Sequence, residues 1–268
     1  MNSQFRRSLT CTVTVLAMFL LPQSCSVKED RRICPCILEV AFAGRERIED
    51  PVTLVGWSDG KVFDDIINTE DYPDVYTHNT PRSMIAFGAV QGLDKCVQKG
   101  HTIVVPTGIE CDSLYAYSEA VDCSGETART TVVFHKQFAT VHIGIINTDF
   151  DAADFSLVLK SHSCGIDLLT CEAIEGEYNC IPRFEDDNKY RCRICRQGDD
   201  SIVLEVTHAS GDNVTFPLGE VASSIGYDWN AVDLQDIFIT LDIARGRIGV
   251  GVAGWESIED FELSTVEL

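Results

Sequence analysis

The sequence contains 268 residues, of which 45% are hydrophobic, and its formal net charge at pH 7 is −21. A chain this acidic repels phosphate backbones and anionic headgroups, so we expect no nucleic-acid partner. The length allows two domains of about 100–150 residues each, and the hydrophobic content indicates that the chain folds.

The first 24 residues have the pattern of an export signal. Arg6 and Arg7 form a short positive region, and the stretch over residues 9–21 is almost wholly apolar. That stretch is shorter than the roughly 20 residues with which a helix crosses a bilayer. We therefore predict a signal peptide over residues 1–24, the alternative being an N-terminal anchor helix.

A cysteine directly after this signal, Cys25, predicts a lipid anchor. Lipoprotein signals end in a small residue and a cysteine whose thiol takes a diacylglycerol, and here the pair is Ser24-Cys25. Two acyl chains are what stable membrane attachment requires. We predict lipidation of Cys25 and a lipidated tether over residues 25–35. The alternative is an ordinary signal with a chance cysteine, because Pro22 and Gln23 are unusual before a lipidated residue.

Alternation of apolar and polar residues, which is typical of strands with one buried face, dominates the rest of the chain. In residues 36–42 the apolar face consists of Cys36, Leu38, Val40 and Phe42. The same period of two occurs over residues 139–146, 155–160, 190–196, 202–208, 237–243 and 248–252. Many short strands with few helices predict an all-β fold of the β-sandwich type.

Turns and breaks divide this pattern further. Asp59-Gly60 lies between two short apolar runs and suits a tight hairpin turn, since glycine tolerates positive φ. Short helices fit only residues 66–71 and 231–236. A polar break over residues 122–128 is the best domain boundary, which gives an N-terminal β-sandwich over residues 36–124 and a C-terminal one over residues 125–268.

Ten cysteines remain in the mature chain after the signal and the lipidated residue are set aside. An even number outside the cytoplasm permits disulfides, and we expect at least one. Several could equally be buried free thiols, because cysteine packs as a small apolar residue. The ten are Cys34, Cys36, Cys96, Cys111, Cys123, Cys164, Cys171, Cys180, Cys192 and Cys195.

Enzyme and metal motifs are missing from the sequence. It contains no GxSxG elbow, no HExxH and no glycine-rich phosphate loop, so we predict no catalytic residues, no cofactor and no enzyme activity. Cys192 and Cys195 form a CxxC, but they lie in a strand pattern that turns the two thiols to opposite faces. We therefore predict no metal site, because zinc requires converging ligands.

The segment that leads into the first strand has a distinctive composition. Cys25 is followed by the charged run Lys28-Glu29-Asp30, then by Arg31 and by Cys34-Pro35-Cys36. This stretch resembles the mature N-terminus of fimbrial anchor lipoproteins of the Bacteroidales, the FimB-like anchors of type V pili. Shorter matches follow at residues 57–62, 113–116, 136–141 and 227–229.

The resemblance implies two transthyretin-like β-sandwich domains after a lipoprotein signal peptide. It implies a lipid-anchored cell-surface subunit that anchors a short fimbria at the outer membrane, with termination of that fimbria as a further expected role. Its partners would be other fimbrial subunits and, through the lipid on Cys25, the outer membrane. Lys28, Glu29 and Asp30 would form the export signal for display on the cell surface.

The C-terminal tail is a candidate donor strand. In the resembling family, polymerising subunits lose an N-terminal strand to proteolysis, and a neighbour's extended segment fills the groove. An anchor whose first strand is tied to its lipid is better suited to donate a strand than to accept one. Two alternating apolar pairs in the tail fit such a role: Phe261 and Leu263, then Val266 and Leu268. The simpler interpretation is that the tail closes the protein's own last sheet.

Two other functions compete with the fimbrial one. A stand-alone surface lipoprotein that binds a glycan or protein ligand would usually display a cluster of exposed aromatic residues. Trp57, Trp229 and Trp255 lie in or beside strand patterns, so we expect them to pack in the core. A secreted hydrolase would need an acid, a base and a nucleophile, and no such set is apparent.

Overall fold

The computed structural model describes residues 34–72, 74–146, 155–185, 188–211, 213–242, 247–253 and 264–267. The predictions about the signal, Cys25 and the run from Lys28 to Asp30 therefore lie outside the described residues. Within the ranges given, no helix is long and apolar enough to cross a membrane. The chain divides into two units after Cys34, and all strands described below belong to the second unit, Pro35–Leu268.

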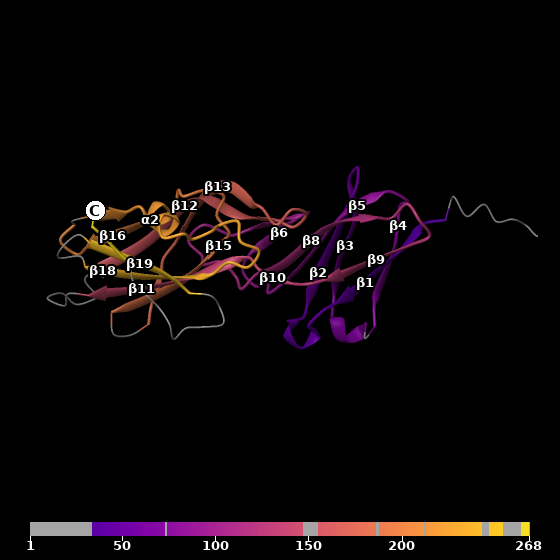
Figure 1. Cartoon of the computed structure of the whole chain (residues 1–268), viewed down its shortest axis with the longest axis horizontal. Coiled ribbons are helices and arrows are strands. Elements are labelled where there is room, and N and C mark those ends of the chain that lie inside the picture. Colours follow the sequence, from indigo (N-terminus) through magenta and orange to yellow (C-terminus); the bar gives the residue numbers. More distant parts are fainter. Residues whose placement is uncertain are drawn as a thin grey trace, which may run out of the picture. The chain divides into compact units, whose positions relative to one another are not determined.

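Two sheets, which we call A and B, enclose the first core (Figure 1). In sheet A, β1 (Cys36–Phe42) lies between β4 (Tyr76–Thr80) and β9 (Thr127–Val132). β1 is antiparallel to β4 and parallel to β9. Sheet B is antiparallel, with the order β10 (His135–Lys136), β8 (Tyr115–Asp122), β5 (Met84–Gln91), β2 (Val52–Trp57) and β3 (Lys61–Ile67).

Sheets C and D enclose the second core. Sheet C is antiparallel, with the order β17 (Asn213–Phe216), β16 (Val203–His208), β12 (Phe155–Asp167), β7 (Thr102–Val104) and β6 (Val97–Lys99), and β13 (Ala173–Cys180) also pairs with β12. Sheet D has the order β14 (Arg183–Phe184), β15 (Lys189–Cys195), β11 (Phe138–Ile146), β18 (Asp236–Asp242), β19 (Arg247–Ala253) and β20 (Ser264–Glu267). Only β11 and β18 run parallel among these described pairs.

The period-two pattern explains why these segments become strands. In β1 the four residues of the predicted apolar face are all buried, whereas Ile37 between them is 44% exposed. In β11 the alternate residues Ala139, Val141, Ile143 and Ile145 are likewise buried. Each strand thus has one face that must pack against another sheet, and two facing sheets satisfy this requirement. The prediction of an all-β sandwich fold is confirmed.

Strand pairing shows where the chain passes between the sheets. The predicted boundary between residues 124 and 125 falls in the turn between β8 and β9, and both strands belong to sheets A and B. The hairpin of β6 and β7, which comes earlier in the sequence, pairs with β12 in sheet C. Whether the two pairs of sheets fold as separate domains stays a prediction.

Helices are short, and one predicted helix is wrong. Among the described residues the helical segments are η2 (Arg45–Arg47), η3 (Thr69–Asp71) and α2 (Leu218–Ser224). η3 lies within the expected segment 66–71. Residues 231–235 form no helix, because the carbonyls of Ala231 and Val232 turn toward the guanidinium of Arg196.

The position of β1 can be tested with two substitutions on opposite faces of the strand. Leu38 is fully buried and Ile37 is 44% exposed. We expect Leu38→Ala to lower the free energy of unfolding by about 2–5 kcal/mol, because it leaves a cavity in the core. The control Ile37→Ala should change it by roughly 0.5 kcal/mol or less. Urea unfolding of both variants measures this difference, and equal losses would contradict the register of β1.

Candidate functional site

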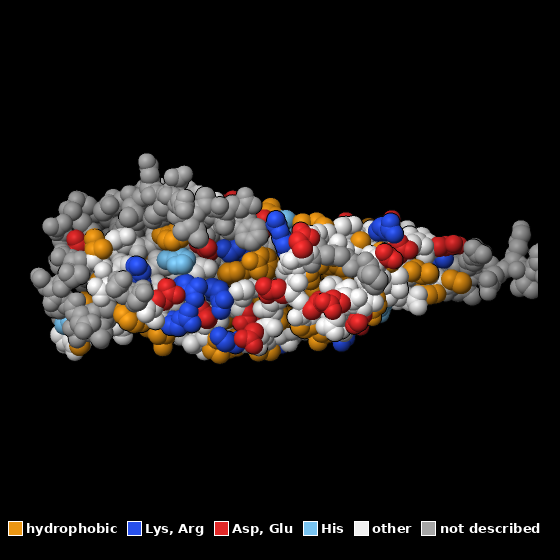
Figure 2. Space-filling model, turned by 90° about the horizontal axis from the view of Figure 1, so that it is seen from below, with side chains coloured by type: hydrophobic (Ala, Val, Ile, Leu, Met, Phe, Trp, Pro, Cys, Tyr) orange, Lys and Arg blue, Asp and Glu red, His pale blue; other side chains and the backbone are white. Residues whose placement is uncertain are grey.

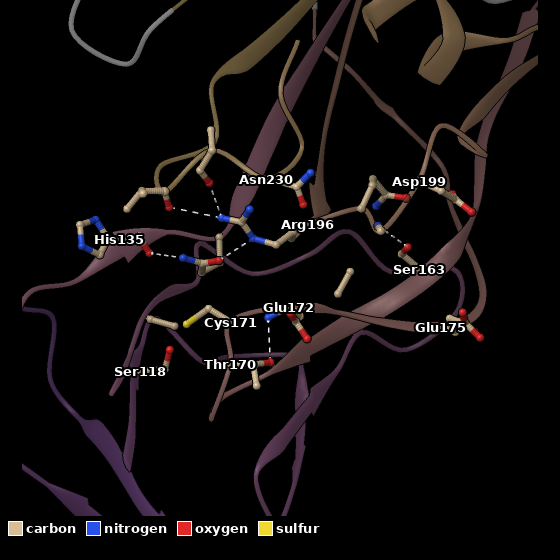
Figure 3. Close-up of a pocket in the computed structure, with 18 of the residues that line it drawn as sticks. Ser118, His135, Ser163, Thr170, Cys171, Glu172, Glu175, Arg196, Asp199 and Asn230 are labelled. Carbon is tan, nitrogen blue, oxygen red and sulfur yellow. Dashed lines mark hydrogen bonds between the residues drawn. The ribbon is translucent and has the colours of Figure 1, made fainter. Parts of the chain in front are cut away.

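A pocket of about 1190 Å³ is the candidate site in the part of the chain that is described. Its walls come from segments that are far apart in the sequence: the end of β12, the start of β13, the middle of β8 and the loops after β15 and before β18. Figure 3 shows Cys171, Thr170 and Glu172 on the side opposite Arg196 and Asn230. The pocket is therefore built by tertiary packing and not by a local motif.

A buried arginine, Arg196, fastens one wall of this pocket. It follows the last residue of β15, and its guanidinium is held by four oxygens of the protein (Figure 3). Nε donates to Gln137 Oε1 at 2.8 Å, and Nη1 donates to the carbonyl of Trp229 at 2.6 Å. Nη2 donates to the carbonyls of Ala231 and Val232, at 2.8 and 3.3 Å. These acceptors are neutral, and burial lowers the pKa of Arg196.

The bonds of Arg196 give it a structural role. Its donors bind the loop that carries Trp229 to Val232 against the strand that begins at Phe138. A guanidinium whose N–H groups are already directed at protein oxygens is poorly placed to hold an anionic ligand. Arg196 therefore positions the wall of the pocket.

The remaining polar groups of the pocket are acids, amides, hydroxyl groups and two histidines. Glu172, Glu175 and Glu177 come from β13 and the turn before it, and Asp199 comes from the loop after β15. Gln197 is 1% exposed; its Nε2 donates to the carbonyl of Cys195 at 2.8 Å, and its Oε1 has no hydrogen-bond partner among the described groups. Carboxylates and amides accept hydrogen bonds, so the lining suits a ligand rich in hydroxyl or amino groups and disfavours an anion.

The pocket lining also contains a thiol and the imidazole of His135, whose Nδ1 lies 3.1 Å from Asp233 Oδ2. Cys171 is the only thiol that lines the described pocket, and burial raises the pKa of Cys171, which keeps it protonated at neutral pH. The thiol of Cys171 is hydrogen-bonded to Ser118, which is not a base. No group of three His, Cys, Asp or Glu side chains in the described ranges could hold a metal ion.

The surface near sheet D carries ion pairs, and its charges are mixed. Arg191 Nε lies 2.9 Å from Glu185 Oε1, and Arg183 Nη2 lies 3.8 Å from the same oxygen. Arg193 Nη2 lies 3.0 Å from Glu110 Oε1. Figure 2 shows basic and acidic side chains gathered together on one face of the molecule. Since each of these arginines has a carboxylate beside it, this surface is not a free cationic site.

The structure places only one of the predicted site residues. Val266 lies in β20, where it pairs with Ile248 of β19, so this segment forms the outermost described strand of sheet D. Cys25, the run Lys28-Glu29-Asp30, and Phe261, Leu263 and Leu268 lie outside the described residues. Their roles in lipidation, export and strand donation stay predictions.

Sequence reasoning missed the pocket and Arg196. Arg196 is the last residue of a run that reads as a strand, and the period of two places it on the inner face with Cys192 and Ile194, but the sequence did not show that its charged side chain would bind a distant loop. The two tryptophans that are described meet expectation in part: Trp229 is 5% exposed, and Trp57 is half-buried with its ring 4.8 Å from that of His101. Cys192 and Cys195 have different side-chain partners, as the strand pattern predicts.

The strand order and the paired sheets define a class of protein: an all-β chain of the β-sandwich type. Solved structures share this fold. The fimbrial anchor protein Mfa2 from Porphyromonas gingivalis is 12% identical, with a TM-score of 0.56, and the match covers 83% of this chain and 98% of that one. The predicted resemblance is thereby confirmed at the level of the fold.

Two Bacteroides proteins are similar to a comparable degree. One from Bacteroides thetaiotaomicron, described as "putative polysaccharide binding", is 14% identical, with a TM-score of 0.61 and coverage of 85% of this chain and 98% of that one. A "putative adhesin" from Bacteroides ovatus is 9% identical, with a TM-score of 0.59 and coverage of 86% and 96%. No family model and no curated protein matches the sequence.

The structural role of Arg196 can be tested against Arg191, an arginine that lies within β15. Arg196→Lys keeps the charge but loses the planar fork, so we expect the free energy of unfolding to fall by about 2–4 kcal/mol. The control Arg191→Lys alters an exposed ion pair and should cost roughly 0–1 kcal/mol. Urea unfolding distinguishes the two, and an Arg196 variant as stable as the control would refute the role.

Proposed function

We propose that this protein is a lipid-anchored fimbrial subunit of the cell surface, which anchors a short fimbria at the outer membrane and also terminates it. The observation that carries the proposal is the fold shared with a fimbrial anchor protein over 83% of this chain, combined with a lipoprotein-type signal that ends at Cys25. Neither observation depends on the other, because the signal lies outside the aligned β-sheets.

The arrangement of β1 supports an anchoring role. The predicted tether, residues 25–35, runs directly into this strand. β1 is hydrogen-bonded to β4 along one edge and to β9 along the other, and Arg129 Nη2 of β9 lies 2.8 Å from Glu39 Oε2 of β1. A force applied through a lipid on Cys25 would therefore act on a strand held on both sides.

The C-terminal edge of sheet D is where we propose that a neighbouring subunit joins. β20 pairs with β19 on one side and ends the strand order of sheet D as described. An edge strand presents unpaired N–H and C=O groups, to which another chain can add a strand. Among the candidate donor residues, Val266 lies in β20. The others, Phe261, Leu263 and Leu268, are close to this strand in the sequence.

The pocket favours a second function, that of a surface lipoprotein binding a glycan. A cavity of about 1190 Å³ lined by carboxylates, amides and hydroxyl groups offers hydrogen-bond partners for the hydroxyl groups of such a ligand. This function can coexist with anchoring or replace it. Retention of the protein without any polymeric partner would favour replacement.

The proposal is tested in cells that lack the chain and are complemented with variants. With no complementation, we expect filaments to be shed into the medium, because their attachment is lost. The unchanged chain should restore them to the cells, whereas Cys25→Ala should release the protein and its filaments together. A variant lacking residues 259–268 should stay in the membrane while filaments are shed. Electron microscopy and immunoblots of cell and medium fractions measure these outcomes.

Two results would contradict the proposal. If filaments stay attached to cells that lack the chain, it is not their anchor. If Cys25→Ala remains in the membrane fraction, the lipid assignment is wrong. Retention of filaments by the variant lacking residues 259–268 would refute strand donation alone, provided that its circular dichroism spectrum matches that of the unchanged chain.

A further inference from the structure

The cysteines of the mature chain are not scattered at random in the fold. The structure gives all ten as free thiols, six of them buried, so the disulfide expected from the sequence is absent from it. Six of the ten nevertheless meet in pairs, thiol against thiol. In each pair, one cysteine lies in or next to one sheet, and its partner lies in or next to the facing sheet.

The first pair, Cys36 and Cys123, lies at one end of the first core. Cys36 begins β1 in sheet A, and Cys123 directly follows β8 in sheet B. The two thiols are hydrogen-bonded to each other, and the hydroxyl of Thr80 contacts Cys123. The same hydroxyl donates to the carbonyl of Cys36 at 3.3 Å, and the N–H of Cys123 donates to the carbonyl of Ser83 at 3.0 Å. Both backbones are therefore fixed where the side chains meet.

The second pair, Cys96 and Cys111, is held by a carboxylate. Asp112 Oδ2 accepts hydrogen bonds from the N–H groups of residues 94, 95 and 96, at 2.8, 2.8 and 2.7 Å. The N–H of Asp112 in turn donates to Cys96 Sγ at 3.5 Å, and the thiols of Cys96 and Cys111 are hydrogen-bonded. Cys96 leads into β6 of sheet C, and the N–H of Cys111 donates to the carbonyl of Arg193 in sheet D.

The third pair, Cys180 and Cys192, crosses the second core. Cys180 ends β13, which belongs to sheet C, and Cys192 lies in the middle of β15 in sheet D. The Cys192 thiol hydrogen-bonds to Cys180 and lowers the pKa of Cys180, which favours its thiolate.

Three other cysteines are hydrogen-bonded to oxygen atoms. Cys195 Sγ donates to the carbonyl of Ser163 at 3.5 Å, and Cys164 Sγ donates to that of Glu175 at 3.7 Å. Cys171 hydrogen-bonds to Ser118. Cys34 is exposed at the end of the predicted tether.

We propose that Cys36–Cys123, Cys96–Cys111 and Cys180–Cys192 are the three disulfides that this protein forms when it is oxidised after export. In each pair the two thiols are hydrogen-bonding neighbours, and closure to a disulfide would bring the sulfur atoms to about 2.05 Å. In each step two S–H bonds break and one S–S bond forms, while the two electrons and two protons reduce the disulfide of an external dithiol oxidant to two thiols.

The three bonds would add covalent links between sheets that apolar packing and hydrogen bonds, such as that from Cys195 Sγ to the carbonyl of Ser163, already hold together. Cys36–Cys123 has a particular consequence, because it would tie the strand next to the tether covalently to sheet B. A pull on the tether could then not slide β1 out of sheet A. This consequence rests on the proposed function, but the pairing itself does not, and it can be tested without a membrane or a filament.

The pairing is read directly by mass spectrometry of the full chain isolated from cells in the presence of N-ethylmaleimide. After digestion without reduction, we expect three linked peptides that join the proposed pairs, and alkylation of Cys34, Cys164, Cys171 and Cys195. Ten alkylated cysteines, also after incubation with oxidised glutathione, would overturn the proposal. So would a linked peptide with a different partner, such as Cys96 joined to Cys195.

Two variants check the consequence for stability. The Tm of the unreduced protein should exceed that of the reduced protein by about 5–15 °C. Cys123→Ser should diminish this difference and expose Cys36 to alkylation, whereas the control Cys164→Ser should change neither. An unchanged difference in Cys123→Ser would refute the first pair. If Cys123→Ser does not fold, the peptide map of the unchanged chain still decides the pairing.

Discussion

The pairing of β1 along both of its edges is the interaction on which the first half of the molecule depends. β1 is the central strand of sheet A, with β4 on one side and β9 on the other. Its inward residues, among them Leu38 and Val40, are fully buried against sheet B. Removing the strand would leave two neighbours with unpaired backbone groups and open the core, and both losses are costly. Detaching β1, the strand nearest to the predicted lipid, would therefore cost a large part of the free energy of folding.

The second half repeats this logic with other residues. β11 is a central strand of sheet D and runs parallel to β18, much as β1 runs parallel to β9. Arg196 fixes the loop before β18 by binding its carbonyls, and Lys136 Nζ lies 2.6 Å from Asp236 Oδ1 at the start of the same strand. These buried polar contacts hold the loop that forms one wall of the pocket. The shape of the pocket therefore depends on the bonds that Arg196 and Lys136 make within the protein.

Much of the fold followed from period-two alternation, because burial of one strand face leaves a direct trace in the sequence. β1, β11 and β16 appear close to their predicted bounds for this reason. The pocket left no such trace, since its walls come from β8, β13 and loops that only tertiary packing brings together. The cysteine pairs were hidden for the same reason: Cys36 and Cys123 are distant in the chain, and only the facing of sheets A and B makes them neighbours.

A subunit that anchors through its first strand keeps that strand in the mature protein, whereas a subunit that accepts a donor strand there loses it. Intact-mass spectrometry of the protein extracted from the membrane fraction distinguishes the two directly. The predicted mature chain begins at Cys25, carries a diacylglycerol on that residue and retains β1. A mature chain that begins after Phe42, or one that begins at residue 25 without lipid, would contradict the account.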